Sequence, residues 1–368
     1  MRSLLLILCT VILASWMASG TVDAQSAVPQ AATKLGSVKL IRANGFDDFV
    51  KQLNDQGKNG YKLVKSVSSG EEGASQSFAA VLRLDPGNTY EYDWMSSPNK
   101  NLLETRLNSR ASYGFSFVNA FPLTSCGGDD SEGNSKSEAL VLRLKKGDAF
   151  LLERSDRSSD PAKEYKVVIG KIGLGKSPTE AIQTSLNNSP AGFRPAKILF
   201  SKTGVTDFAI SVLLEKDLNV TNSPKIEYRF VKEVNGFEKS LNSLAAQGFR
   251  ILSGRRIGLV KMALMAKETS APVVYTLVDE EKYAKQFDET VNRGNRFEDI
   301  FAGDVDCGSS RRVNEKLIFT QNSTERKYDY RIIPVSDSVD ADVERLLVEG
   351  FSIRDIFFYQ GLKVIFEK

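Results

Sequence analysis

The sequence predicts an α+β protein of about six tandem strand–helix–strand–strand units, with antiparallel sheets covered on one face by helices. Three observations favour this fold. A glycine followed by an aromatic residue recurs five times after a helical pattern, strand-like runs flank each helix, and short polar links join successive strands. Self-similarity with a period near 50 residues is typical of repeat architectures.

The repeated mark ends each predicted helix. It lies at Gly60-Tyr61, Gly114-Phe115, Gly192-Phe193, Gly248-Phe249 and Gly350-Phe351, and Phe297 marks a sixth copy in which Asn295-Arg296 replaces the glycine. Seven residues earlier, two helical turns away on the same helix face, an apolar residue recurs at Leu53, Leu107, Leu241 and Val343. The glycine supplies the left-handed residue that ends a helix.

Strand-like runs stand on either side of each helix. The first strands are expected at 37–42, 89–95, 164–170, 226–234, 273–279 and 328–335, and the last strands at 78–85, 139–146, 208–216, 259–267, 315–321 and 362–368. Many runs alternate apolar and polar residues, as antiparallel strands with one wet face do. The links Asp85–Asn88 and Lys145–Asp148 are predicted hairpins, so that neighbouring units could share a sheet.

The first 24 residues predict export. Arg2 precedes an apolar run from Leu4 to Ala14, and small residues lie at Val22 and Ala24, before Gln25. The run is short of the ~20 apolar residues that a spanning helix needs. We therefore expect a signal peptide at 1–24 and a periplasmic or secreted chain with no membrane span after cleavage.

Composition suggests further boundaries. We expect a disordered linker at 25–36, an N-terminal domain at 37–154 with units 1 and 2, a linker at 155–163, and a C-terminal domain at 164–368 with units 3 to 6. The 155–163 stretch carries Pro161 among charged and hydroxyl residues.

Charge and composition exclude several functions. The chain has 49 Lys and Arg against 46 Asp and Glu, interspersed along its length, which does not fit a nucleic-acid partner. Histidine is absent, so Ser-His-Asp and Cys-His nucleophiles and histidine-based zinc sites are excluded. We expect no metal and no cofactor.

The helix ends carry a resemblance. The segments "LNSLAAQGFRIL", "LETRLNSRASYGFSFV" and "VERLLVEGFSI" resemble small bacterial domains of unknown function with a leucine-rich helix, a Gly-aromatic pair and a two-stranded finish. The likeness covers about thirty residues of each unit. It implies the fold of the unit and lends no catalytic residues.

One segment matches a nucleotide-binding motif. "GKIGLGKS", from Gly170 to Ser177, fits the phosphate-loop pattern, in which backbone amides hold phosphates, Lys176 reaches the terminal ones and Ser177 holds magnesium. The glycines of the match are Gly170 and Gly175. The short links favour antiparallel pairing, whereas a phosphate-loop fold needs a parallel sheet. Ser177 as an N-cap before Pro178 explains the same residues without a ligand.

Acidic and cysteine residues complete the candidates. Acid pairs occur at Glu71-Glu72, Asp129-Asp130, Glu280-Glu281 and Asp304 with Asp306, and would suit an exported carbohydrate hydrolase. Of the three cysteines, Cys9 lies in the expected signal peptide, so two remain after cleavage. Cys126 and Cys307 lie in corresponding Gly- and Asp-rich segments, and an even number in an oxidising compartment favours a disulfide. Two free thiols are the alternative.

The sequence therefore favours an exported, non-enzymatic binding or interaction protein of the bacterial cell envelope, with an envelope protein or glycan as partner. The alternatives are an exported hydrolase that uses loop carboxylates and a nucleotide-binding protein that uses Gly170 to Ser177. Repeat arrays present extended surfaces, so strand edges or long loops are expected to contact the ligand.

Overall fold

The computed structural model describes most of the chain after residue 37. The described ranges are 38–69, 76–96, 100–122, 148–156, 162–170, 178–202, 208–220, 225–233, 235–257, 260–267, 272–279, 283–301, 316–321, 328–335, 339–358 and 362–368. Residues 37–368 belong to one structural unit. The expected signal peptide at 1–24 and linker at 25–36 lie outside the described residues.

The described residues form six repeated units, each with three strands and one helix. The first strands are β1 (Val38–Asn44), β4 (Tyr90–Ser96), β7 (Lys163–Gly170), β10 (Tyr228–Glu233), β13 (Val274–Asp279) and β16 (Tyr330–Pro334). The helices are α2 (Phe46–Gly57), α3 (Lys100–Ser112), α5 (Pro178–Asn187), α6 (Phe237–Ala245), α7 (Tyr283–Asn292) and α8 (Val339–Val348). The second strands are β2 (Tyr61–Ser69), β5 (Ser116–Pro122), β8 (Arg194–Lys202), β11 (Phe249–Ile257), β14 (Asn295–Phe301) and β17 (Ser352–Phe358). The third strands are β3 (Ser77–Leu84), β6 (Asp148–Ser155), β9 (Phe208–Asp217), β12 (Val260–Lys267), β15 (Lys316–Gln321) and β18 (Leu362–Glu367). The fold class predicted from the sequence is confirmed.

Each unit has its own three-stranded antiparallel sheet, with the third strand in the centre. Two predictions were therefore wrong. The Asp85–Asn88 link joins β3 to β4, which belong to different sheets, so it is not a hairpin. The third strand of unit 2 is β6, which starts at Asp148, and not the run 139–146, which lies outside the described residues. Without shared sheets, the units must be joined by side-chain packing.

The central strands are buried on both faces. In β6, Phe150 and Leu152 pack with α3 of their own unit, whereas Ala149 and Leu151 join the core that contains Phe49 of α2. Each sheet therefore carries its own helix on one face and packs against the preceding unit on the other. This explains why the third strands are nearly continuous apolar runs and not the alternating pattern expected of strands with one wet face.

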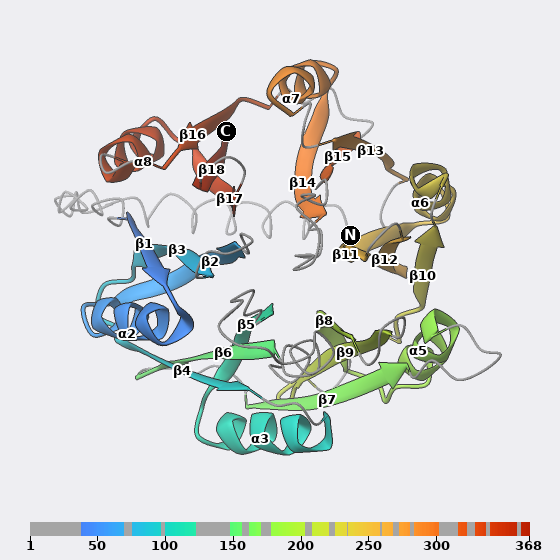
Figure 1. The fold of residues 1–368 in the computed structure, drawn as a ribbon, viewed down its shortest axis with the longest axis horizontal. Coiled ribbons are helices and arrows are strands. Elements are labelled where there is room, and N and C mark those ends of the chain that lie inside the picture. Colours follow the sequence, from blue (N-terminus) through green and yellow to red (C-terminus); the bar gives the residue numbers. More distant parts are fainter. Residues whose placement is uncertain are drawn as a thin grey trace, which may run out of the picture. The chain divides into compact units, whose positions relative to one another are not determined.

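Six shared cores close the units into a ring. Each core combines residues of two neighbouring units, and the last one joins Val343 and Phe366 of unit 6 to Val38 and Val81 of unit 1. The second strands approach one another around this ring, and Figure 1 shows the helices on its outside. The 155–163 stretch joins β6 to β7, whose units share a core.

The Gly-aromatic mark is a left-handed helix end. All five predicted glycines have positive φ, for example 89° at Gly248. At the end of α3, Phe115 N–H bonds the carbonyl of Arg110 and Gly114 N–H bonds that of Ala111, the pattern of a Schellman motif. The sixth copy needs a correction. Gly294, with φ of 83°, takes the glycine position, Asn295 starts β14, and Phe297 lies two residues further on the same strand face.

A tyrosine in the first strand of a unit connects it to the second strand of the preceding unit. We call this contact the tyrosine clasp. The hydroxyl accepts a hydrogen bond from a backbone N–H at 2.7 to 3.0 Å at four interfaces, from Leu63 to Tyr92, Phe117 to Tyr165, Ile251 to Tyr275 and Phe297 to Tyr330. Burial raises the pKa of Tyr92, Tyr165 and Tyr330, so these hydroxyls remain protonated at neutral pH.

A helix asparagine holds the backbone of the same tyrosine, which we call the asparagine clasp. Asn54 accepts a hydrogen bond from the N–H of Tyr92 and donates one to its carbonyl, both at 2.8 Å. The same pair of bonds joins Asn108 to Tyr165, Asn187 to Tyr228 and Asn242 to Tyr275. The two clasps fix the register of one unit on the next.

The interface between units 3 and 4 has an incomplete tyrosine clasp. Pro195 takes the strand position that Leu63 has in unit 1, and proline has no N–H to donate. The neighbouring position on the central strand is Ala266, where unit 2 has Glu153. The Tyr228 hydroxyl is consequently buried without a hydrogen-bond partner among the described residues.

Candidate functional site

Each second strand contains a β-bulge at the same position. The extra residues are Val64, Val118, Ala196, Leu252, Glu298 and Arg354, and the residues that follow them are Lys65, Asn119, Lys197, Ser253, Asp299 and Asp355. A bulge redirects side chains and is often found beside functional sites. We call these six following residues the post-bulge positions. They are candidate functional residues.

Four of the post-bulge residues make polar contacts across unit boundaries. Lys197 donates to the Asn119 side chain at 2.8 Å, and Asn119 donates to the Ser66 carbonyl and hydroxyl at 3.2 and 3.0 Å. Lys65 lies 3.8 Å from the Asp355 carboxylate. These bonds join unit 6 to 1, 1 to 2 and 2 to 3, so the side chains connect the units.

Asp355 is a post-bulge residue whose carboxyl group is buried. Burial raises its pKa to about 6, while Lys65 opposes the rise and Asp299 adds to it. Its Oδ1 accepts a hydrogen bond from Ile356 N–H at 2.8 Å, as Asn119 does from Ala120. A carboxyl with this pKa can exchange a proton near neutral pH.

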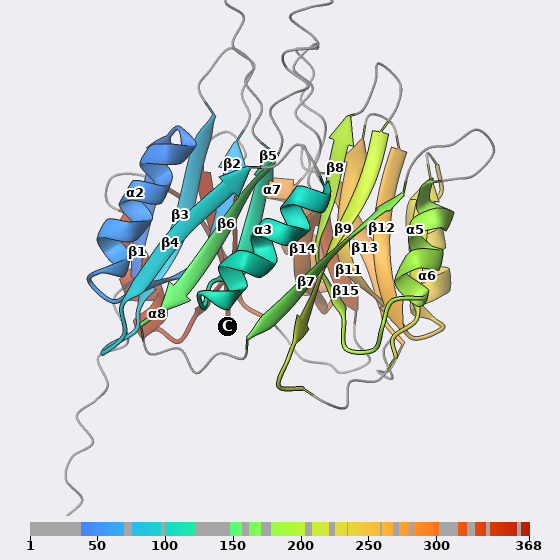
Figure 2. The same ribbon diagram turned by 90° about the horizontal axis from the view of Figure 1, so that it is seen from below.

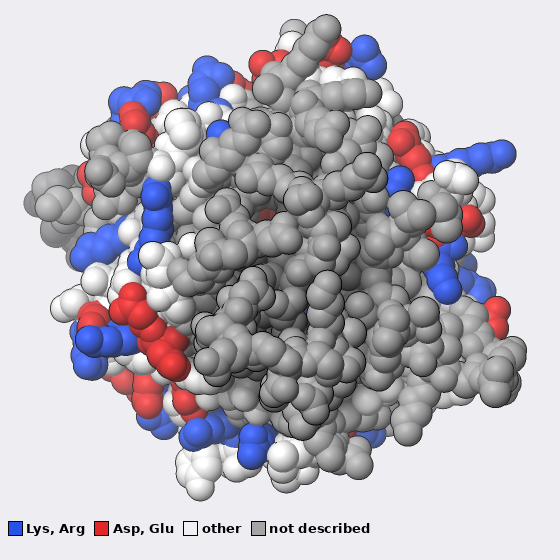
Figure 3. All heavy atoms as spheres, viewed as in Figure 1, with Lys and Arg blue, Asp and Glu red and all other residues white. Residues whose placement is uncertain are grey.

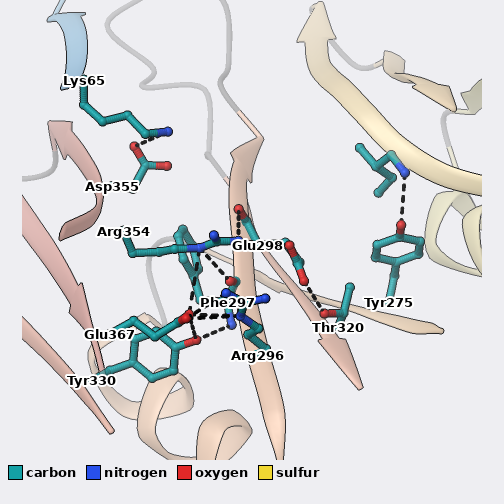
Figure 4. A network of polar contacts seen from close by, with 11 residues as sticks. Lys65, Tyr275, Arg296, Phe297, Glu298, Thr320, Tyr330, Arg354, Asp355 and Glu367 are labelled. Atoms are coloured by element: carbon teal, nitrogen blue, oxygen red, sulfur yellow. Dashed lines mark hydrogen bonds and ion pairs between the residues drawn. The ribbon is translucent and has the colours of Figure 1, made fainter. Parts of the chain in front are cut away.

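A denser network joins β14, β16, β17 and β18, shown in Figure 4. Arg296 makes a two-nitrogen contact with Glu367, with bonds of 2.8 to 3.2 Å, and the Tyr330 hydroxyl donates to the same carboxylate at 2.7 Å. Burial alone would raise the pKa of Glu367, but the bonds from Arg296 and Tyr330 outweigh it and lower that pKa. Arg354 Nη2 forms an ion pair with Glu298 Oε2 at 3.0 Å. Charges are thus matched by hydrogen-bonded partners, which stabilises the interface between units 5 and 6.

A surface hollow of about 500 Å³ lies between α2 and unit 2. Its lining residues mix both charge signs: Asn54, Lys58, Thr89, Tyr90, Glu91, Arg154, Ser155 and Asp156. Arg154 pairs with Glu91, Asp156 accepts the Thr89 N–H at 2.9 Å, and Asn54 forms the asparagine clasp. The polar groups of the hollow are therefore engaged with the protein itself. Figure 3 likewise shows both charge signs around the periphery of the face in view.

The residues singled out from the sequence mostly lie outside the described parts. Gly170 ends β7, an edge strand that pairs antiparallel with β9, and α5 begins at Pro178 as predicted. Outside the described residues lie Gly175, Lys176 and Ser177, the cysteines Cys126 and Cys307, and the acids Glu71, Glu72, Asp129, Asp130, Glu280, Glu281, Asp304 and Asp306. The structure thus brings none of these side chains together in its described part.

Sequence reasoning missed the clasps and the bulges. The clasps did leave a signal, because the pair Leu-Asn recurs at Leu53-Asn54, Leu107-Asn108, Leu186-Asn187 and Leu241-Asn242, and a tyrosine recurs in the first strands. The bulges left none, because their extra residues range from valine to arginine.

Within the described ranges, no group of three or more His, Cys, Asp or Glu could hold a metal ion, and no helix is long and apolar enough to cross a membrane. Comparison with protein-family models, curated proteins and solved structures found no match to the chain.

Proposed function

We propose that the chain is an exported, non-enzymatic binding protein of the bacterial cell envelope, which contacts an envelope protein or glycan through one end of the ring. The observation that supports this is where the chain links fall. First and second strands both run antiparallel to the third, so the ends of both lie at one end of each unit. Figure 2 shows the arrowheads of β4 and β8 at that end and that of β6 at the other.

The two longest links between elements, 123–147 and 302–315, begin and finish at this end, which we call the link-bearing end. The links after the second strands are 70–76, 123–147, 203–207, 258–259, 302–315 and 359–361. The opposite end has the glycine turns and the links between units, such as 85–89 and 218–227. In repeat proteins, insertions that gather on one face often form the binding face.

The candidate residues found in the sequence, apart from Gly170 at the end of β7, belong to links at this same end. Glu71 and Glu72 lie between β2 and β3, Cys126 with Asp129 and Asp130 between β5 and β6, and Cys307 between β14 and β15. The segment 171–177 joins β7 to α5, and 280–282 joins β13 to α7. The polar and variable parts of the six units thus start from one end of a common scaffold, as binding loops do on other folds.

The test compares two replacements. Purified chain is incubated with immobilised cell-wall glycan and, separately, with detergent-solubilised envelope proteins. We expect binding that is lost when 123–147 and 302–315 are each replaced by a short Gly-Ser link. Binding should persist when 221–224, at the opposite end, is replaced instead.

Two results would contradict the proposal. Binding that survives both long-link replacements would place the ligand elsewhere. Release of soluble sugar from the glycan, abolished by Asp129→Asn or Asp130→Asn, would identify a hydrolase.

A further inference from the structure

The six interfaces of the ring are not equivalent. The interfaces from unit 1 to 2, 2 to 3 and 4 to 5 have both clasps. The interface from 3 to 4 keeps its asparagine clasp, with Asn187 on Tyr228. The interface from 5 to 6 keeps its tyrosine clasp at Tyr330, reinforced by Arg296 on Glu367.

At the interface from unit 6 to unit 1, which we call the seam, different residues occupy the clasp positions. Register places Val38 where the tyrosines lie in the other first strands, and valine has no hydroxyl. Glu344 replaces the asparagine of the other helices. It lies six residues before Gly350, as Asn54 lies six residues before Gly60. Neither clasp can form at the seam with these side chains.

The seam is held mainly by apolar packing. Its core joins Val38 and Val81 to α8 residues such as Leu346 and Leu347. Two polar contacts between described residues cross it: Arg42 donates to the Val335 carbonyl, and the Lys65–Asp355 pair measures 3.8 Å with Lys65 45% exposed. At 3.8 Å, the Lys65–Asp355 pair lacks the short hydrogen-bonded geometry of strong ion pairs.

The seam also lacks a covalent tie. Units 6 and 1 are the last and first along the chain, so no short peptide joins their strands. Between units 1 and 2, by contrast, the segment 85–89 links β3 directly to β4. A short link keeps two separated surfaces at a high effective concentration, which favours their reassociation. No such link favours reassociation of the two surfaces at the seam.

We propose that the ring opens reversibly at the seam, with units 6 and 1 separating while the other five interfaces stay closed. Opening exposes the apolar side of α8 and the outer face of β1 and β3, and it gives access to the post-bulge positions Lys65 and Asp355. This conformational step is independent of which ligand the link-bearing end takes. The seam suits such a local opening because it lacks both clasps and a short chain link, although its apolar core is no smaller than that between units 5 and 6.

Hydrogen exchange of the full chain, followed by mass spectrometry, tests the proposal. We expect β1 and β17 to exchange roughly tenfold faster than their counterparts β13 and β14. Glu344→Asn installs the asparagine of the other helices opposite the Val38 backbone. It should slow β1 and β17 by roughly tenfold, the effect of two added hydrogen bonds. Asp288→Asn, which installs an asparagine at the same helix position of α7, should leave the exchange of β1 and β17 unaltered.

A second variant tests the seam without relying on a new hydrogen bond. In a circular permutant, Lys368 is joined to Val38 by five residues copied from 85–89, and new termini are opened within 221–224. The tie should slow exchange of β1 and β17 to the rates of β13 and β14. The proposal fails if β1 and β17 of the natural chain already match β13 and β14, or if the permutant leaves their faster exchange unchanged.

Discussion

Two tyrosines of the same structural position should respond oppositely to loss of their hydroxyl groups. The Tyr92 hydroxyl accepts the Leu63 N–H at 2.8 Å and donates to Glu153 at 2.9 Å. The Tyr228 hydroxyl is buried without a partner among the described residues. Tyr92→Phe and Tyr228→Phe delete the same atom, from side chains that are 3% exposed in both cases.

The magnitudes follow from what each deletion leaves behind. Tyr92→Phe leaves the buried Leu63 N–H unpaired, which costs about 1–3 kcal/mol of unfolding free energy. Tyr228→Phe removes a hydroxyl whose unpaired burial costs about 1–3 kcal/mol in mutational data, so the variant should be as stable as the natural chain or more stable.

Urea unfolding followed by fluorescence measures the difference, with both variants compared at one temperature and pH. In a Pro195→Ala background an N–H faces Tyr228, so Tyr228→Phe should become destabilising there. A double-mutant cycle isolates this coupling. Equal loss of stability in both single variants would refute the clasp, because the hydroxyl effect would then not depend on the Leu63 N–H.

Three other features of the chain can be tested in the same way. Gly248→Val should lower the unfolding free energy by about 1–2 kcal/mol or more, because a β-branched residue resists the φ of 89°; an unchanged urea midpoint would disprove the strain. Burial raises the pKa of Asp355 to about 6 from 3.8, so its stabilising contribution is fully present below about pH 4 and lost as the pH rises through 6. Asp355→Asn, which copies Asn119, removes this loss, so the unfolding free energy of the variant relative to that of the natural chain should rise by about 2 kcal/mol between pH 4.5 and pH 7.5; parallel pH profiles of the two proteins would contradict this. Finally, Cys126 and Cys307 should form a disulfide in exported protein, and alkylation with mass analysis before reduction would contradict it by labelling two thiols.

The structure of the single unit could be predicted from the sequence because it depends on residues that lie close together in the chain. Helix faces such as Leu53 and Leu107, the glycine ends and the first strands all follow from periodicity within about 50 residues. The sixth copy was misassigned because Gly294 is followed by Asn295 and the aromatic residue comes only at Phe297. The third strand of unit 2 was misplaced because 139–146 and Asp148–Ser155 are both apolar runs of strand length.

Relations between units were not predictable in the same way. Whether the apolar run of β6 faces one helix or two depends on the neighbouring unit, which periodicity cannot show. The bulges depend on pairing register, which flips every side chain with a one-residue slip. The acids, cysteines and Gly175–Ser177 segment could be placed only by topology, as links of one end. Their chemistry therefore rests on experiment.

The most direct test of the binding end is photo-crosslinking in a cell envelope. A benzophenone amino acid is placed at Asn44, exposed where β1 ends at the link-bearing end, or at Tyr113, which is 64% exposed before the glycine turn at the opposite end. Irradiation should give a crosslinked envelope protein or glycan from position 44 and none from position 113. Crosslinks from position 113 alone would contradict the account, because the partner would then contact the glycine-turn end.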